Sequence, residues 1–371
     1  MPQYYKVDPA HYFTSPRLSW DAMLKMTGIK LELMTDVDMF QFIEKGMRGG
    51  ISYISHRYGK ANNKHMKDYD SFGPSKFIMY LDMNNLYGAR ISQCLPTGGF
   101  KWLNQKKISK INLGTYTADS KKGLILEVEL QYPSNLHNLH NDYPLGAEKL
   151  KVTKDMLSPY CKNIEEKYGI SIGQVNKLIP TVSDKKNYVL HYRNLQLYLS
   201  LGLKLKKVHR VLEFDQSPWL KQYIDFNTQK RTNAKNVLEK DFFKLLNNSI
   251  YGKTCENLRK IIDVRLVADQ KKLSKLVSKP TFVNSKIFNE KVVVHKIKES
   301  LTPDRPAYIG MCILDLSKVL MYDFHYNYIK QKYSDRAKLL FTDTDSLCYE
   351  IQTEDAYKDF WIDRDKFDNS D

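Results

Sequence analysis

The sequence lacks any pair of closely spaced cysteines. Its cysteines are odd in number and far apart, with no CxxC pair among them: Cys94, Cys161, Cys255, Cys312 and Cys348. This pattern argues against a disulfide framework and against a zinc ribbon. It favours a protein that works in a reducing compartment.

Hydrophobic runs are short as well. The opening stretch MPQYYKVDPAHYFTSPR has no apolar segment that could act as a signal peptide, and no later segment is long and apolar enough to span a bilayer. We therefore expect a soluble, intracellular protein with no membrane partner. The nucleus, the cytoplasm and the mitochondrion all stay open as its location.

Histidine and cysteine offer little for a metal site. His137 and His140 have a metal-like spacing, but they lie in the polar loop SNLHNLHNDYPLG and no third ligand follows nearby. Two such histidines are more often solvated than bound to a metal. We predict that both side chains face solvent.

Basic residues are in excess. The chain of 371 residues has 58 Lys and Arg against 42 Asp and Glu, a formal net charge of +16, and the excess is spread along the chain. Such a balance favours a polyanionic partner such as nucleic acid, and a merely basic soluble protein is the alternative. The length predicts one large multi-lobed domain or two to three subdomains.

The apolar pattern and the turn signals predict a mixed α+β architecture. In chain order the expected elements are two helices around Gly28 within 18–48, a strand over 76–82, a strand over 123–133, a helix over 191–203, a strand over 208–214, a helical run from about 228 that is strongly helical until Asn248–Gly252, a small basic β-rich insertion after 260, a helix over 314–333, and a tight hairpin over 339–351.

Acidic residues stand at the ends of two of the expected strands. In LLFTDTDSLCYEI, Asp343 and Asp345 lie two residues apart, so an extended chain would point both carboxylates to one side. Such a pair is costly without a cation. In YLDMNNLYGARISQ, Asp82 ends an apolar strand and Tyr87 follows at the start of a helical turn.

A third segment combines a cation, an amide and an aromatic ring. In the helix KLLNNSIY, Lys244, Asn248 and Tyr251 fall within a sector of about 60°, and Lys240 extends the same stripe. Lysine supplies a compact positive charge for phosphates, and tyrosine supplies a flat surface for a base or a sugar. A nucleoside triphosphate with two divalent metal ions held by the acids would account for all three segments.

These segments resemble known motifs. DMNNLY is similar to DxxSLYP, KLLNNSIYG to KxxxNSxYG, and FTDTDS to YxDTDS, which are motifs A, B and C of the family B DNA polymerases, in the same order. MRGGISYISHR resembles the YxGG linker of the protein-primed members, and the gaps between the motifs resemble their two insertions. The amino-acid sequence from about Ser19 onward looks most similar to the polymerases of Polinton/Maverick elements and their linear-plasmid and viral relatives.

The resemblance implies an α+β fold made of a polymerase palm, helical fingers and family-type insertions, with the thumb and most of the exonuclease domain absent. The implied parts are 1–45 as a remnant of the exonuclease connection, 46–75 as the YxGG-like linker, 76–105 as palm with motif A, 106–218 as palm and first insertion, 219–262 as fingers with motif B, 263–300 as second insertion, 301–357 as palm with motif C, and 358–371 as the start of a truncated C-terminal region.

The resemblance also implies a template-directed DNA polymerase that uses two Mg²⁺ ions. Its partners would be primer-template DNA, deoxynucleoside triphosphates and a terminal priming protein. Asp82 and Asp345 would be the main metal ligands, with Asp343 as a supporting acid. Tyr87 would be the gate that excludes a ribose 2′-hydroxyl.

Further roles follow from the same resemblance. Lys244 would bind the incoming phosphates, Asn248 and Tyr251 would shape the nucleotide pocket, and Gly252 would allow close approach. The remaining implied residues are Lys230 or Arg231 for an additional phosphate contact, and Arg48, Gly49, Gly50 and Ser249 for DNA.

The sequence departs from the family patterns at single positions. Asn85 stands for the serine and Gly88 for the proline of motif A, Met47 for the tyrosine of the linker, and Phe341 for the tyrosine of motif C. None of these changes removes an implied metal ligand.

Other family motifs are not found. Paired exonuclease acids are not found ahead of Met47, so we expect no digestion of DNA from the 3′ end. The KxY motif and the thumb are not found after motif C, so we expect weak, distributive or undetectable extension. A decayed, DNA-binding copy is one alternative. An RNA-synthesising palm enzyme is another, which Tyr87 and the DTDS form disfavour.

Overall fold

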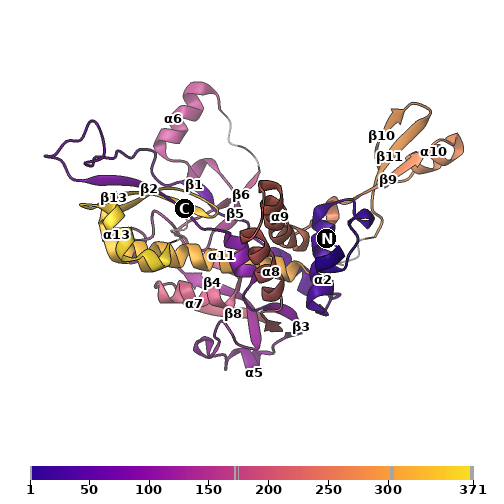
Figure 1. Ribbon diagram of the computed structural model, residues 1–371, viewed down its shortest axis with the longest axis horizontal. Helices are drawn as coiled ribbons and strands as arrows, with labels where there is room; N and C mark the ends of the chain where they lie inside the picture. The colour runs from indigo at the N-terminus through magenta and orange to yellow at the C-terminus, as the bar shows by residue number, and fades with distance from the viewer. Residues whose placement is uncertain (1, 171–172, 174, 301–304, 368–371) are drawn as a thin grey trace.

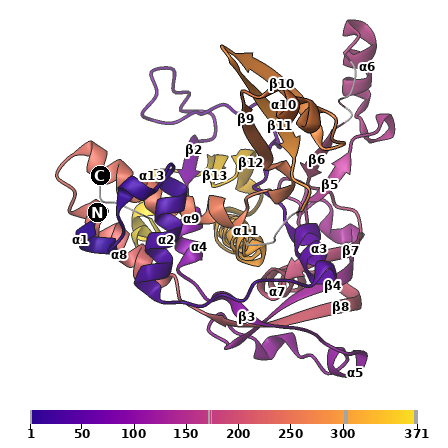
Figure 2. The same ribbon diagram turned by 90° about the vertical axis from the view of Figure 1, so that its right-hand side faces the viewer.

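The computed structural model describes residues 2–170, 173, 175–300 and 305–367. Two antiparallel sheets and a set of helices surround one long buried helix, α11 (Ala307–Asp323). Figure 2 shows this helix nearly end-on in the middle of the molecule. The helix continues through a π-helical turn at Phe324–Ile329 into α12 (Lys330–Tyr333), so the predicted helix over 314–333 is observed.

The first sheet carries the acidic strand ends. Its strands are antiparallel neighbours in the order β1 (Ser52–Ile54), β12 (Ala337–Asp343), β13 (Ser346–Gln352) and β2 (Lys76–Asp82). In this register Asp82 pairs with Ser346, and Ser346 pairs with Asp343. The sheet therefore brings the carboxyl ends of β2 and β12 to one edge, which the separate sequence segments alone do not show.

The second sheet packs on the other side of α11. Its strands follow the order β3 (Leu95–Trp102), β8 (Lys204–Ser217), β4 (Lys122–Gln131) and β7 (Lys185–His191), and α7 (Tyr192–Ser200) follows directly after β7. β4 is buried along most of its length, which agrees with its apolar sequence LILEVEL. The strands predicted over 123–133 and 208–214 are thus both observed.

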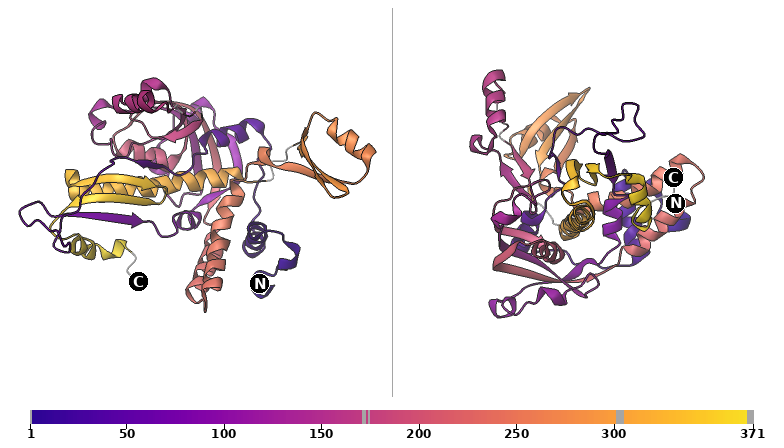
Figure 3. Two further views of the ribbon diagram at one scale, coloured as in Figure 1. Left: turned by 90° about the horizontal axis from the view of Figure 1, so that it is seen from above. Right: turned by 90° about the vertical axis from the view of Figure 1, so that its left-hand side faces the viewer.

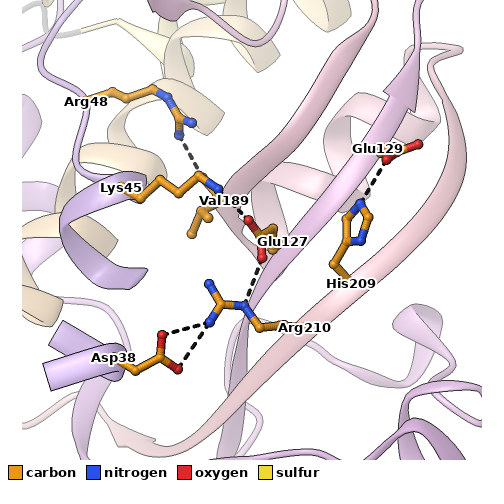
Figure 4. Close-up of polar contacts among 8 residues, drawn as sticks. All are labelled: Asp38, Lys45, Arg48, Glu127, Glu129, Val189, His209 and Arg210. Atoms are coloured by element: carbon orange, nitrogen blue, oxygen red, sulfur yellow. Dashed lines mark hydrogen bonds and ion pairs between the residues drawn. The ribbon is translucent and has the colours of Figure 1, made fainter. Parts of the chain in front are cut away.

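An ion-pair network fastens α3 (Val37–Gly46) to this second sheet (Figure 4). The Arg210 side chain bridges the carboxylates of Asp38 and Glu127, at 2.9 Å from each, and Lys45 pairs with Glu127 from the helix side. Burial alone would raise the pKa of Glu127, but the two cations outweigh burial and lower it. The network attaches α3 to the second sheet just before the linker 48–52.

Two helices form an upright pair beside the first sheet: α8 (Lys221–Thr232) and α9 (Val237–Thr254). The sequence predicted one helical run that weakens at Asn248–Gly252, and this prediction is wrong in two ways. First, the run is two helices, because the Asn236 side chain accepts a hydrogen bond from the Glu239 amide and so caps the start of α9. Second, α9 does not weaken at the NNSIYG segment but continues through it to Thr254. An N-cap asparagine is a strong start signal, and it separates the two helices here.

The N-terminal helices α1 (Pro2–Tyr5) and α2 (Ser15–Thr27) pack along this pair (Figure 3). The Ser19 hydroxyl donates to the Leu246 carbonyl at 2.6 Å and lies 3.0 Å from the Tyr223 hydroxyl. α2 ends at Gly28, whose left-handed backbone (φ 62°) has no side chain to strain, and α3 follows as the second predicted helix. The helices α1 and α2 are therefore packed together with α8 and α9.

Two small subdomains project from the body of the protein, one at the top and one at the upper right of Figure 1. The first contains β5 (Glu148–Lys151), α6 (Pro159–Tyr168) and β6 (Asn176–Ile179). The second is the predicted basic β-rich insertion, a sheet of β9 (Ile262–Val267), β11 (Lys291–Ile297) and β10 (Phe282–Phe288) with α10 (Gln270–Val277). The remaining helices are α4 (Leu86–Ile91), α5 (Gln105–Ile108) and α13 (Ala356–Ile362). The eight predicted part boundaries stay predictions.

All five cysteines are free, as predicted. In the part of the chain that the structure describes, no helix is long and apolar enough to cross a membrane. The prediction that His137 and His140 are solvated is wrong for His140, which is 1% exposed. Its Nδ1 lies 2.8 Å from the Tyr132 hydroxyl, so this histidine belongs to the core.

Buried histidines make the fold sensitive to acid. Burial lowers the pKa of His140 to about 4 and that of His191 and His325 to about 3, and the Nε2 atom of each has no partner among the described residues. In the unfolded chain these histidines bind protons near pH 6.5, whereas in the folded chain they stay neutral down to about pH 4. Each histidine should therefore cost about 2 kcal/mol of unfolding free energy when the pH falls from 7.5 to 5.

Urea unfolding at the two pH values measures this loss. His325→Gln should reduce the pH-dependent loss by about 2 kcal/mol. His11→Gln, at an exposed position, should leave it unchanged. An equal loss in all three proteins would show that these histidines do not control acid stability.

Candidate active site

The three predicted acids meet at one edge of the first sheet. Asp343 ends β12, Asp345 follows in the turn, and Asp82 ends the neighbouring β2. The turn is tight: the Asp345 amide donates to the Asp343 carbonyl at 2.6 Å, and the Asp345 carbonyl accepts from the Met83 amide at 2.8 Å. The backbone thus ties the motif C turn directly to the end of β2.

Asp343 and Asp345 do not point to one spot, although their spacing predicts it. Thr344 between them adopts a left-handed backbone with φ 58°, so the alternation of an extended strand does not hold across the turn. The Asp343 carboxylate accepts from the Ser52 hydroxyl at 2.6 Å on β1. Asp345 instead faces a cavity together with Asp82.

This cavity has a volume of about 820 Å³ and lies between the acidic sheet edge, α4 and the α8–α9 pair. Two acids, three cations, several amides and hydroxyls, and one aromatic ring line it. The lining residues are Asp82, Met83, Asn84, Asn85, Leu86, Tyr87, Thr228, Arg231, Thr232, Ala234, Lys240, Lys244, Asn248 and Asp345. Opposite charges therefore face one another across a space large enough for a nucleotide.

The acidic side favours a bound cation. Burial raises the pKa of Asp345, and the negative charges of Asp82 and then Asp343 raise it further. A divalent cation would relieve this repulsion, and carboxylate oxygens are ligands that Mg²⁺ prefers. Within the described ranges no group of three or more His, Cys, Asp or Glu side chains is placed to hold a metal, and the acids that line the cavity are Asp82 and Asp345.

The aromatic side consists of two stacked rings. The Tyr87 ring stacks on the Tyr251 ring with centroids 4.4 Å apart and planes 8° apart. Burial raises the pKa of Tyr87, and the charge of Asp345 raises it further, so this hydroxyl stays neutral. Tyr87 lines the cavity and Tyr251 supports it from outside the cavity lining.

The basic side differs in part from the sequence prediction. Arg231, Lys240, Lys244 and Asn248 all line the cavity, as one face of α8 and one face of α9 would require. Lys230 does not, because its ammonium lies 4.2 Å from the centre of the Tyr4 ring. Of the two alternatives for an added phosphate contact, the structure places Arg231 at the cavity.

None of the four residues predicted to contact DNA lines the cavity. Arg48 and Ser249 are buried, and the Ser249 hydroxyl donates to the Leu245 carbonyl at 2.6 Å within α9. Their burial does not support direct DNA contact through these side chains. Gly50 packs against Thr344, whereas Gly49 and Gly252 have no atom within 4 Å of the place of a Cβ atom.

Sequence reasoning missed several polar groups of the cavity, among them Asn84 and two threonines of α8. Thr228 and Thr232 of α8 line it beside Arg231. Their spacing of four residues places them on one helix face, next to the arginine. That stripe was the available signal, and it was hidden because the start of α9 was not recognised at Asn236.

The two-sheet fold around α11 defines a mixed α+β protein in which two acids and three cations line one cavity. Residues 2–331 match the family described as DNA polymerase type B, organellar and viral, and the chain belongs to this family. The predicted family and the predicted α+β fold are thereby confirmed.

Solved structures of phi29 DNA polymerase share the fold. The complex with primer-template DNA and incoming nucleotide substrates has a TM-score of 0.54 at 17% identity, and the orthorhombic crystal form has 0.54 at 15%. The complex with single-stranded DNA has 0.51 at 17%. Each match covers 94% of this chain and 50% of the phi29 chain, so this chain spans about half its length. No curated protein matches this sequence.

The two departures from the family pattern in motif A are adjacent in space. Asn85 has a left-handed backbone (φ 53°), and its amide nitrogen would lie 2.1 Å from a Cβ atom at Gly88. Gly88→Ala alone should therefore slow nucleotide incorporation about tenfold by displacing Asn85 from the cavity wall. The shorter serine in Asn85→Ser/Gly88→Ala should recover most of this loss.

A double-mutant cycle on single-turnover incorporation rates measures the coupling. We expect a coupling energy of about 1 kcal/mol or more between the two positions. Strictly additive effects would show that Asn85 and Gly88 act independently.

Proposed function

We propose that this chain carries the nucleotidyl-transfer site of a template-directed DNA polymerase. The reaction joins a deoxynucleoside monophosphate to a primer 3′-hydroxyl, or to the hydroxyl of a priming protein, and releases pyrophosphate. The observation that carries the proposal is the single cavity in which Asp82 and Asp345 face Arg231, Lys240 and Lys244. A metal-bound triphosphate needs such an arrangement of acids on one side and cations on the other.

The basic side would bind and orient the triphosphate. Lys240 and Lys244 are one turn apart on α9, so both ammonium groups can reach one phosphate chain. Arg231 lines the same cavity, so its guanidinium would add donors for a phosphate oxygen. Asn248 would contribute an amide to the same pocket.

The acidic side would hold two Mg²⁺ ions through Asp82 and Asp345, with Asp343 supporting the turn through Ser52. When bound, these ions supply activation of the attacking hydroxyl and stabilise the leaving pyrophosphate. Tyr87 would close the pocket against a ribose 2′-oxygen. Its stacking on Tyr251 keeps the ring from moving aside.

DNA is the partner that the charge and the family membership support. The net charge of +16 gives a long-range attraction for phosphates. The phi29 DNA polymerase that shares this fold was solved with primer-template DNA and with single-stranded DNA. We propose that this chain likewise binds primer-template DNA.

Binding should depend steeply on salt. If about four phosphates are contacted, affinity for a DNA duplex should fall by about a hundredfold between about 50 and about 200 mM NaCl, with little dependence on base sequence. Fluorescence anisotropy with two duplexes of unrelated sequence measures both effects. A shallow salt slope, or strong preference for one duplex, would contradict binding through phosphates.

Single-turnover incorporation tests the reaction itself. The chain is mixed in excess over a labelled primer-template with Mg²⁺ and one deoxynucleoside triphosphate at a time. We expect extension by one residue with the complementary nucleotide only. DNA binding without any templated extension would instead favour the alternative of a decayed DNA-binding protein.

A further inference from the structure

A cluster of charged groups lies buried beneath the active-site edge. Arg48 is 6% exposed, Asp315 is 2% exposed and Lys318 is 6% exposed. Arg48 belongs to the linker after α3, and the other two belong to the central helix α11. Burying three charged side chains costs more folding free energy than burying apolar side chains of similar size. A functional role would explain why these charges are buried here.

Lys318 holds the backbone of the linker. Its ammonium donates to the Arg48 carbonyl at 2.7 Å and to the Leu314 carbonyl at 3.2 Å. Asp315, one turn away, provides a nearby negative charge and accepts from the His191 amide at 2.8 Å. Burial lowers the pKa of Lys318 to about 8, although Asp315 acts in the opposite direction.

Arg48 is fixed from its side-chain end as well. Its guanidinium donates to the Val189 carbonyl of β7 at 2.7 Å (Figure 4) and lies 3.8 Å from the centre of the Tyr188 ring. The linker residue is therefore clamped between the second sheet and α11. Its position cannot change without breaking contacts to both.

The linker after Arg48 contacts the motif C turn directly. Two residues after Arg48, a Cβ atom at Gly50 would lie 2.4 Å from the Thr344 side chain, so the backbone and the turn are in close contact. The Ile51 carbonyl accepts from the Thr344 amide at 3.0 Å, and Ser52 holds Asp343. Thr344 thus meets the linker on two sides.

A small void joins the cluster to the nucleotide side. It has a volume of about 10 Å³, and Lys318, Gly50, Thr344 and Tyr87 all line it. The void has room for about one water molecule, so the Lys318 side chain, the turn and the Tyr87 ring lie close around it. A shift of the Lys318 side chain would be transmitted to both.

We propose that Lys318, with Asp315 as its counter-charge, is a positioning residue that fixes the linker 48–52 and thereby the place of Asp345. The inference rests on the proposed function only in what the position of Asp345 serves. Catalytic groups displaced by about 1 Å can lose on the order of a hundredfold in rate, which gives a reason for the buried charges.

Three variants separate positioning from stability. Lys318→Met removes the bond to the linker and leaves Asp315 buried without its nearby cation, so it should also lower the unfolding temperature. Asp315→Asn/Lys318→Met removes both charges and should regain most of that stability. Gly50→Ala perturbs the turn from the other side and leaves the cluster intact, and Gly49→Ala, with no atom near its Cβ, is its matched control.

Amide hydrogen exchange of the turn, followed on a peptide that covers 339–347, is the first readout. Exchange there should be about tenfold faster or more in Lys318→Met, in the double variant and in Gly50→Ala, and unchanged in Gly49→Ala. Affinity for Mn²⁺, used as the probe cation without DNA, is the second readout. It should weaken about tenfold in the same three variants.

The outcomes separate the two proposals. A double variant that is as stable as the parent chain, with parental exchange at the turn, would overturn the positioning role and leave the cluster a purely structural feature. An Asp345→Ala variant that keeps parental Mn²⁺ affinity would instead overturn the proposed acid site, whatever the exchange data show. Fast exchange with weakened Mn²⁺ affinity in the stable double variant supports both.

Discussion

Asp345→Ala is expected to lower the single-turnover rate of nucleotide incorporation by about a thousandfold or more. The Asp345 carboxylate faces the cavity beside Asp82. Burial and the charge of Asp82 raise its pKa, so a bound cation would stabilise its ionised form. Loss of a metal ligand should remove several kcal/mol of transition-state stabilisation, and each 1.36 kcal/mol is about tenfold in rate. Asp82→Ala should have an effect of the same size.

The measurement compares incorporation and DNA binding in the same variants. DNA affinity should stay within about twofold, because phosphate contacts and not these acids supply it. Asp343→Asn is the matched control: its carboxylate bonds to Ser52 and does not line the cavity, so we expect less than about a tenfold loss. If Asp343→Asn were as damaging as Asp345→Ala, the assignment of unequal roles would be wrong.

The sequence predicted the acidic edge well because strand ends are marked locally. Asp82 follows an unbroken apolar run, and the observed β2 has the predicted bounds of Lys76–Asp82. The side of the Asp343 carboxylate could not be predicted in the same way. It depends on the left-handed backbone of Thr344 and on a hydroxyl of β1 that lies almost three hundred positions away in the chain.

The basic wall shows the same limit. The 3.6-residue period of α9 was sufficient to place Lys244 and Asn248 on one face. It could not assign Lys230, because the Tyr4 ring that attracts its ammonium comes from the N-terminal helix packed on α8. A helix period gives the face of a residue, whereas the neighbour of that face is decided by tertiary packing.

Arg48 shows a neighbour that the sequence could not predict. The resemblance to the YxGG linker implied a contact with DNA, but the Arg48 guanidinium lies on the Tyr188 ring and donates to the Val189 carbonyl. Arginine stacks well on aromatic rings and tolerates burial when its donors are satisfied. No feature of the linker sequence itself identifies β7 as the partner.

Tyr87→Val is expected to raise the use of ribonucleotides relative to deoxyribonucleotides by about a hundredfold. The Tyr87 ring lines the cavity and stacks on Tyr251 at 4.4 Å, and we expect this contact to oppose rotation of the ring away from an added 2′-oxygen. Such a steric conflict costs about 1–3 kcal/mol, and its removal corresponds to roughly five- to 160-fold in rate. The shorter valine leaves room for the oxygen.

Single-turnover incorporation of the matching ribonucleotide and deoxyribonucleotide, each over a range of concentrations, gives the ratio of the two efficiencies. Tyr87→Phe is the matched control, because it keeps the ring and loses only the hydroxyl, so its ratio should stay within about threefold of the parent chain. The deoxyribonucleotide rate of Tyr87→Val should fall less than its selectivity, since the phosphate and acid contacts remain. An unchanged ratio in Tyr87→Val, with Tyr251 still folded in place, would mean that the sugar of the incoming nucleotide lies away from this ring.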